Sequence, residues 1–256
     1  MMRTRDWIRF YTFIPLAGAV LAGASLLQAL LVVALYLDLI GYAFVVNNYF
    51  DVEIDRQHPG KMESGKNPLA SGVVSYRGVQ ALMALQIGLA LLSYAVSPVG
   101  AGLVAANIVL VTAYSMSGIR LKERIGLDIV THGLMFGMVP FLAGYALVQG
   151  GVSGEAVAVS LPLFLLACEA LLAHQIVDYS QDLNATRTTV TVIGQRNGML
   201  VIGVLGVASA VAMIGIGQMN ILPYWMAAAA GWYLLAYPVY SCRGIFHDIR
   251  SRASLE

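Results

Sequence analysis

The sequence is short of charged residues. Only 11% of its 256 residues are Asp, Glu, Lys or Arg, whereas 59% are hydrophobic. A soluble domain usually carries about 25% charged and at most about 50% apolar residues. A soluble fold of this length could not bury so much apolar surface, so lipid must solvate the excess. The composition therefore excludes an ordinary soluble enzyme.

The sequence also lacks an excess of positive charge. Its 15 Lys and Arg are balanced by 14 Asp and Glu, which leaves a net charge of +1. A nucleic-acid-binding protein needs a basic excess to neutralise phosphates, so we expect no nucleic-acid partner.

Cysteine is also scarce. Cys168 and Cys242 each lie in an apolar run and form no CxxC pair, which favours small buried side chains over redox or metal chemistry.

Long apolar runs, in contrast, fill most of the chain. A transmembrane helix needs about 20 apolar residues. Eight windows meet this length, at 7–27, 28–48, 77–97, 98–117, 127–149, 156–177, 198–218 and 221–242. Polar segments at 49–76, 118–126 and 178–197 separate some of them. We therefore expect an all-α, polytopic transmembrane bundle that forms a single domain over residues 1–256.

Basic residues indicate how this bundle is oriented. With eight spans, all 15 Lys and Arg fall on the side that holds both termini and the three polar segments, and the opposite loops hold none. Cytoplasmic loops of membrane proteins carry such an excess of Lys and Arg. We therefore expect an integral protein of the cell membrane with both termini and the polar loops in the cytoplasm.

Two acidic clusters close apolar runs on that cytoplasmic side. Asn47, Asp51 and Asp55 follow the second window at spacings of four residues, and Asp178 and Asp182 follow the sixth. On a helix, residues at this spacing share one face about 6 Å apart. Two carboxylates at that separation repel by roughly 3 kcal/mol at an effective dielectric near 20, so a cation that neutralises them is expected. Oxygen ligands favour Mg²⁺ or Ca²⁺ over zinc. The alternative is a pair of solvated acidic helix ends.

Basic and hydroxyl side chains flank both clusters. Lys61 and Lys66 follow the first cluster, Tyr114 to Lys122 includes Ser115 and Arg120, and Arg187 follows the second. These cations set the topology in any case. Beside bound Mg²⁺ they would also take up the charge of a diphosphate, and we give this role first to Lys66 and Lys122.

These motifs together resemble the UbiA superfamily of intramembrane prenyltransferases. Asn47-x-x-x-Asp51-x-x-x-Asp55 with Pro68-Leu69-Ala70-Ser71-Gly72 is similar to its first aspartate-rich motif. The segment from Tyr114 to Lys122 is similar to its second loop, and Asp178-x-x-x-Asp182 with Thr188-Thr189 is similar to its second aspartate-rich motif. The order and spacing match over about residues 7–242.

The resemblance implies a helical barrel around a lipid-open central cavity and Mg²⁺-dependent transfer of an isoprenyl chain from its diphosphate. Mg²⁺ is then expected on Asp51, Asp55, Asp178, Asp182 and Asn47, and the donor diphosphate on Asn47, Lys66, Tyr114, Arg120 and Lys122. The sequence departs from the family in three ways. Asn48 replaces a common Asp, Asn67 replaces a common Arg, and we count eight spans where the family usually has nine.

The acceptor and the competing functions stay open at this point. The acceptor is hydrophobic or amphiphilic, and a quinone precursor, a porphyrin or an archaeal-type ether lipid all fit. The alternative function is a transporter or cation channel that uses the intramembrane acids Asp38 and Glu169, because buried acids in spans are costly and often functional. Transporter sites usually lie near the midplane, whereas both acidic clusters lie at helix ends.

Overall fold

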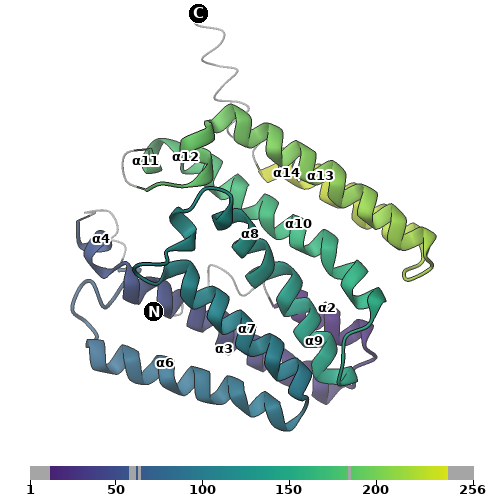
Figure 1. Cartoon of the computed structure of the whole chain (residues 1–256), viewed down its shortest axis with the longest axis horizontal. Helices are drawn as coiled ribbons and strands as arrows, with labels where there is room; N and C mark the ends of the chain where they lie inside the picture. Colours follow the sequence, from purple (N-terminus) through teal and green to yellow (C-terminus); the bar gives the residue numbers. More distant parts are fainter. Residues whose placement is uncertain (1–11, 58–61, 63–64, 184–185, 242–256) are drawn as a thin grey trace, which may run out of the picture. The chain divides into compact units, whose positions relative to one another are not determined.

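Every regular element in the described part of the chain is helical (Figure 1). The computed structural model describes residues 12–57, 62, 65–183 and 186–241, and it confirms the expected all-α class. Lys61, Cys242 and the basic residues near both termini lie outside these ranges. Cys168 is buried among apolar side chains, as expected for a small core residue.

Six helical segments in the described ranges are long and apolar enough to cross a membrane. They are Leu26–Phe50, Tyr76–Ala95, Pro98–Ser115, Leu127–Gln149, Gly154–Val177 and Gln195–Gln218. Each matches one of the eight windows expected from the sequence. The windows 7–27 and 221–242 contain helices α2 (Phe13–Leu21) and α14 (Tyr224–Ser241), and for these two a full span stays a prediction.

The chain divides into two compact units, each made of two stretches of sequence. Unit 1 is Met1–Leu121 with Val139–Ala156, and unit 2 is Lys122–Met138 with Val157–Glu256. A single functional domain over 1–256 stays a prediction. Each unit carries one of the two acidic motifs.

Unit 1 contains the described helices that begin before residue 121, together with α9 from its second stretch of sequence. They are α2, α3 (Leu26–Phe50), α4 (Val52–Arg56), α6 (Tyr76–Leu91), the 3-10 turn η1 (Leu92–Ala95), α7 (Pro98–Ser115) and α9 (Val139–Gln149). Three of these helices have a serine at the N-cap. The side chains of Ser25, Ser75 and Ser97 accept hydrogen bonds from backbone N–H groups of the first turn. These caps set where the long helices begin.

Two glycines allow α2 and α9 to approach closely within unit 1. A Cβ atom on Gly18 would lie 2.0 Å from the carbonyl oxygen of Phe141, and one on Gly144 would lie 2.0 Å from that of Pro15. No side chain fits in that space. Helix pairs in membranes pack through such small residues because lipid provides no hydrophobic drive between them.

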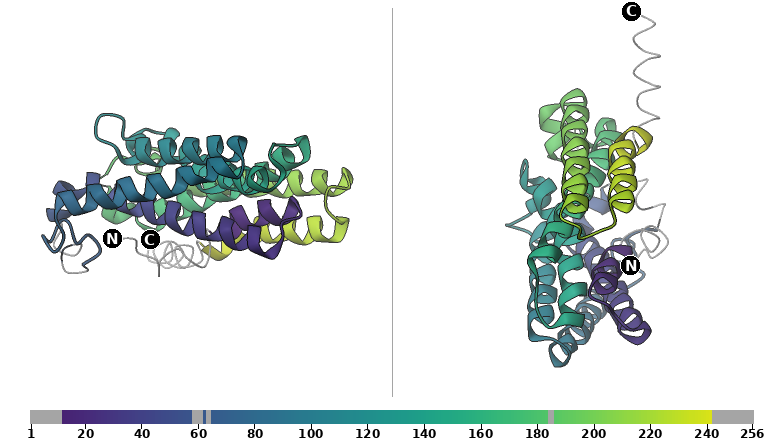
Figure 2. Two further views of the ribbon diagram at one scale, coloured as in Figure 1. Left: turned by 90° about the horizontal axis from the view of Figure 1, so that it is seen from below. Right: turned by 90° about the vertical axis from the view of Figure 1, so that its right-hand side faces the viewer.

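Unit 2 contains the remaining helices. They are the 3-10 turn η2 (Leu121–Glu123, whose first residue belongs to unit 1), α8 (Leu127–Gly133), the π-helical turn η3 (Leu134–Met138), α10 (Gly154–Val177, whose first three residues belong to unit 1), α11 (Tyr179–Asp182), α12 (Thr189–Ile193), α13 (Gln195–Gln218) and α14. Helices α13 and α14 pack side by side (Figure 2). Gly133 and Gly137 pack against Phe164 and Leu163 of α10, where a Cβ would clash.

Candidate functional site: two acidic helix ends

The first acidic motif lies where α3 ends and α4 begins. Asp51 has φ −97° and ψ 6°, which interrupts the helix for one residue. The helical hydrogen bonds nevertheless continue, from the N–H of Asp51 to the oxygen of Asn47 at 3.0 Å and from the N–H of Asp55 to the oxygen of Asp51 at 2.8 Å. The three side chains therefore keep the four-residue spacing along one face that the sequence predicts.

Both carboxylates of this motif are buried and held by donors. Asp51 and Asp55 are 8% and 7% exposed. The guanidinium of Arg120 lies 3.3 Å from Oδ1 of Asp51, and the amide of Asn67 donates to Oδ2 of Asp55 at 2.9 Å. Because each carboxylate faces a positive charge or an N–H dipole, part of the repulsion between them is offset. Arg120, a predicted diphosphate ligand, thus lies at the motif.

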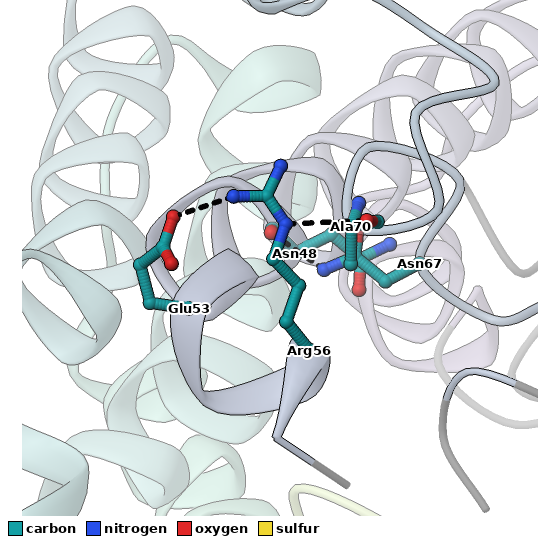
Figure 3. A network of polar contacts seen from close by, with 5 residues as sticks. All are labelled: Asn48, Glu53, Arg56, Asn67 and Ala70. Atoms are coloured by element: carbon teal, nitrogen blue, oxygen red, sulfur yellow. Dashed lines mark hydrogen bonds and ion pairs between the residues drawn. The ribbon is translucent and has the colours of Figure 1, made fainter. Parts of the chain in front are cut away.

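Asn67 is the centre of a hydrogen-bonded loop beside the motif. Its amide nitrogen also donates to the backbone oxygen of Asn48 at 2.8 Å, and its amide oxygen accepts from the N–H groups of Leu69 and Ala70. Figure 3 shows Asn67 next to Asn48 and Ala70. Asn67 is 5% exposed, so the side chain that departs from the family pattern joins the 67–70 turn to the acidic helix end.

Arg56 secures the same loop from its outer side. Its Nη1 atom lies 2.8 Å from Glu53, and its Nε atom donates to the backbone oxygen of Ala70 at 3.2 Å (Figure 3). The ion pair is exposed and contributes little by itself. The bond to Ala70 ties α4 to the loop, so Arg56 acts as a loop anchor and Asn67 as the link to Asp55.

The end of α7 completes the surroundings of the first motif. Ser115 donates to Oδ1 of Asn47 at 3.2 Å, and the neighbouring Tyr114 is half-buried in the last turn of α7. The chain then turns sharply, with Arg120 at φ 40°, a conformation that non-glycine residues seldom adopt. Strain of this kind is common at binding sites. Here the turn carries the Arg120 side chain to Asp51.

The second acidic motif, in unit 2, repeats the local geometry of the first. Asp178 breaks the helix between α10 and α11 with φ −87° and ψ 2°. The N–H of Asp178 bonds to the oxygen of His174, and the N–H of Asp182 bonds to the oxygen of Asp178. His174 lies 3.3 Å from Oδ2 of Asp178, and Thr186 donates to Asp182 at 3.4 Å. Sequence reasoning placed the carboxylates here, but it assigned no contact to His174.

A buried carboxylate that sequence reasoning missed holds the segment after the second motif. Asp128 is 0% exposed. Its Oδ2 atom accepts from the side chain of Gln175 and the N–H of Thr189, both at 2.8 Å, and its Oδ1 atom accepts from the Thr189 hydroxyl. Gln175 in turn accepts from the N–H of Val190. Asp128 therefore fixes the start of α12 to α8 and α10, next to the Thr188-Thr189 pair.

The remaining predicted diphosphate ligands occupy separate places. Lys66 is exposed in the loop before Asn67, and its backbone oxygen accepts from Asn48 at 3.3 Å. Lys122 is half-buried in η2 of unit 2. Unit 1 thus brings together Asn47, Asp51, Asp55 and Arg120, while the contacts of Lys66 and Lys122 with a diphosphate stay predictions.

The donor atoms of both motifs suit Mg²⁺. Among the described residues, no three His, Cys, Asp or Glu side chains form a dedicated metal cage. Mg²⁺ seldom uses one, because it usually takes one or two carboxylates and fills its other positions with water and substrate phosphate. A carboxylate can accept about four bonds. Asp51 and Asp55 place two such carboxylates along one face of the first acidic motif, and Asp178 and Asp182 place two in the second.

Comparisons with solved structures support the helical fold. A UbiA homologue from Archaeoglobus fulgidus, solved with DMAPP and Mg²⁺, is 20% identical, with a TM-score of 0.74 over 90% of this chain and 82% of that one. A UbiA homologue from Aeropyrum pernix K1 is 20% identical, with a TM-score of 0.69 over 93% and 97% of the two chains. A structure of digeranylgeranylglyceryl phosphate synthase is 18% identical, with a TM-score of 0.71 over 95% and 85%.

The family model for UbiA prenyltransferases matches residues 10–251. No curated protein matches the sequence. The match spans nearly the whole chain and both acidic motifs, in a structure whose helices are apolar enough for a bilayer. The chain therefore belongs to the UbiA prenyltransferase family and is an integral membrane enzyme.

Proposed function

We propose that this enzyme transfers an isoprenyl chain from its diphosphate to a hydrophobic or amphiphilic acceptor with the help of Mg²⁺. The observation that carries the proposal is the first acidic helix end, where two buried carboxylates on one face lie beside an arginine. This combination offers ligands for a cation and a charge partner for an anion. Asp178 and Asp182 repeat the spacing and the helix break.

Each acidic motif is assigned a role in binding the donor's head group. Asp51, Asp55, Asp178 and Asp182 would hold Mg²⁺, and Asn47 would contribute its amide oxygen. Bound Mg²⁺ would neutralise negative charge on the leaving pyrophosphate. Lys66, Arg120 and Lys122 take up the phosphate charge that remains, and Tyr114 donates a hydrogen bond to the diphosphate.

The chemistry required of the protein is then modest. Cations held around the diphosphate stabilise the charge that develops as the bond between the allylic carbon and oxygen breaks. A nucleophilic group of the acceptor attacks the allylic carbon and loses its proton. The Asp51–Arg120 pair keeps the arginine oriented before the donor arrives, which reduces the ordering required at the moment of reaction.

The donor class is supported by ligands seen in structural neighbours. The Archaeoglobus fulgidus homologue was solved with DMAPP and with GPP, each together with Mg²⁺. For the acceptor we favour a quinone precursor or an archaeal-type ether lipid, and the similarity to digeranylgeranylglyceryl phosphate synthase supports the lipid. The protein would act in the cell membrane, with both acidic motifs on the cytoplasmic side.

The transporter alternative rests on Asp38 and Glu169, and the surroundings of Glu169 suit a structural role. Glu169, one of its two key acids, is fully buried in α10 and accepts a hydrogen bond from Ser209 of α13 at 2.9 Å. This bond satisfies Oε1 and links two packed helices, as polar side chains inside membranes often do, whereas Oε2 has no partner among the described residues. We therefore expect Glu169→Gln to leave prenyl transfer intact.

The proposed function can be tested with radiolabelled geranylgeranyl diphosphate. Purified enzyme in liposomes is offered a 4-hydroxybenzoate-type quinone precursor, a glyceryl phosphate ether lipid and a porphyrin in separate reactions. We expect one of these to yield labelled lipid product and free pyrophosphate in equal amounts, with EDTA abolishing both. Product formation without release of pyrophosphate would contradict the proposal. The absence of labelled product with all three acceptors would contradict it as well.

A further inference from the structure

A pocket lies in unit 1, away from the acidic helix end. It has a volume of about 400 Å³ and is lined by the first half of α3, the end of α6 with η1, and the end of α9. Its walls are nearly all aliphatic, with Leu31, Leu35, Leu92 and Leu147 among the lining residues. A volume of this size is typical of sites for small organic ligands.

One ionisable side chain, Asp38, lines this apolar pocket. Asp38 lies twelve residues after the start of α3 at Leu26, about 18 Å along the helix at 1.5 Å per residue, and therefore near the middle of the bilayer. Its Oδ2 atom is buried and has no hydrogen-bonding partner among the described residues. Leaving such an atom unpaired in an apolar medium costs several kcal/mol.

Polar groups near Asp38 in the described part of the chain do not satisfy this Oδ2 atom. Gln86 of α6 donates to the backbone oxygen of Asp38 at 3.1 Å. The other polar lining residues bond within the chain, because Gln28 accepts from Ser25 and Ser93 donates to the oxygen of Ala90. The side chain of Asp38 also contacts the side chain of Gln86, yet its Oδ2 atom still has no hydrogen-bonding partner among the described residues, which points to a ligand.

The pocket is independent of the first acidic motif. Nine residues separate Asp38 from Asn47 along α3, which is about two and a half turns at 3.6 residues per turn, so the two side chains leave the helix on opposite faces. The pocket also lies toward the helix end that carries Ser25, whereas the motif closes the other end.

We infer that this pocket binds a lipid-soluble molecule that carries a hydroxyl group on an apolar chain or ring. A hydroxyl both donates and accepts hydrogen bonds, so it can pair with Asp38 whether the carboxyl is neutral or ionised. A carbonyl group can only accept, and an ammonium group can only donate. The aliphatic walls hold the apolar part, and the hydroxyl meets Oδ2. The occupant is an isoprenoid or fatty alcohol, or a phenol.

Competition binding tests this inference without any need for catalysis. Tritiated farnesol is bound to purified protein in detergent. Three unlabelled competitors are then compared: farnesol, nonylphenol, and farnesene, which lacks the hydroxyl. We expect farnesol to compete about tenfold better than farnesene, since one hydrogen bond to an otherwise unpaired buried group is worth about that factor. Strong competition by nonylphenol identifies a phenol as the ligand, and weak competition identifies an alcohol.

Matched variants separate this pocket from binding elsewhere. Ala34→Trp should fill the pocket and abolish the specific binding, whereas Leu27→Trp, on the same helix but outside the pocket, should not.

Variants of Asp38 test the contact with the hydroxyl group. Asp38→Leu should keep the thermal stability of the protein or raise it, and it should bind alcohol and hydrocarbon equally. Asp38→Asn should restore part of the preference. A preference for farnesol that survives in Asp38→Leu, or equal binding of alcohol and hydrocarbon by the unmodified protein, would overturn the inference. Because the readout is binding, a failure of prenyl transfer leaves this result unaffected.

Discussion

Asn67 shows how a single side chain can organise the candidate site. Its amide nitrogen donates to Asp55 and to the backbone of Asn48, while its oxygen closes the turn to Leu69 and Ala70. An arginine, common in the family at this position, would supply charge. This asparagine instead fixes the conformation of the turn, and we propose that Lys66, Arg120 and Lys122 bind the phosphate.

We predict that Asn67→Ala lowers both stability and activity. The loss of a buried bond to a carboxylate and of the turn's acceptor should cost about 1–3 kcal/mol, seen as a lower Tm in detergent. Asn67→Asp is the matched variant, because it keeps the turn's acceptor but places a negative charge beside Asp55. If Asn67 serves the turn alone, Asn67→Asp will behave like the unmodified protein, and the link to Asp55 is then unimportant.

We predict that Lys122→Ala raises KM for the donor or lowers turnover by roughly ten- to a hundredfold. The loss of one charge-assisted contact costs about 1.5–3 kcal/mol, which corresponds to that range of rates. Arg124→Ala removes a charge from the same polar segment and serves as the control. Steady-state kinetics with labelled donor measures both. Equal effects of the two variants would reduce Lys122 to a determinant of topology.

At the scale of elements, Asp128 links three helices of unit 2. It accepts from Gln175 of α10 and from Thr189 at the start of α12, while it belongs to α8 itself. The segment that follows Asp182 is therefore held by a buried carboxylate, so the position of Thr188-Thr189 depends on α8.

We predict that Asp128→Ala destabilises the protein by about 3 kcal/mol or more. Its removal leaves buried donors of Gln175 and Thr189 without an acceptor, and each such group costs about 1–3 kcal/mol. Thermal unfolding should show a clear fall in Tm, accompanied by reduced turnover. Glu155→Ala, an exposed acid at the start of α10, is the control and should change neither. An unchanged Tm in Asp128→Ala would show that the network is dispensable.

The elements were more predictable than the contacts between them. The apolar run of 28–48 predicts the helix α3, which extends over Leu26–Phe50, because burial in lipid requires a long apolar helix. The spacing of Asp51 and Asp55 likewise predicts a shared face. The structural role of Asn67, which the sequence singles out only as a departure from the family, and the whole of Asp128 were missed. Their hydrogen bonds join segments far apart in sequence, whereas residue spacing indicates only local neighbours.

The whole molecule is expected to place both acidic motifs in the cytoplasm, since all Lys and Arg fall on that side of the eight expected spans. We predict that single cysteines at Glu123 and Arg187, in a background without Cys168 and Cys242, resist an impermeant thiol reagent in intact cells. A cysteine at Gly150 should react. Permeabilised cells provide the control, because all three positions should then react. Reaction of the cysteine at position 187 in intact cells would show that the orientation is the opposite of the one expected.

The central claim is that both acidic motifs serve one Mg²⁺-dependent transfer reaction. The most direct test measures prenyl transfer in liposomes for the unmodified enzyme, Asp51→Asn, Asp182→Asn and the double variant, with Mg²⁺ and with EDTA. We predict that each single variant loses most activity while staying folded. The double variant should lose much less than the sum of the two, because residues that act together are not additive. Mg²⁺ should restore the EDTA-treated unmodified enzyme but neither variant. Full activity in either aspartate variant, or activity of the unmodified enzyme in EDTA, would contradict the account.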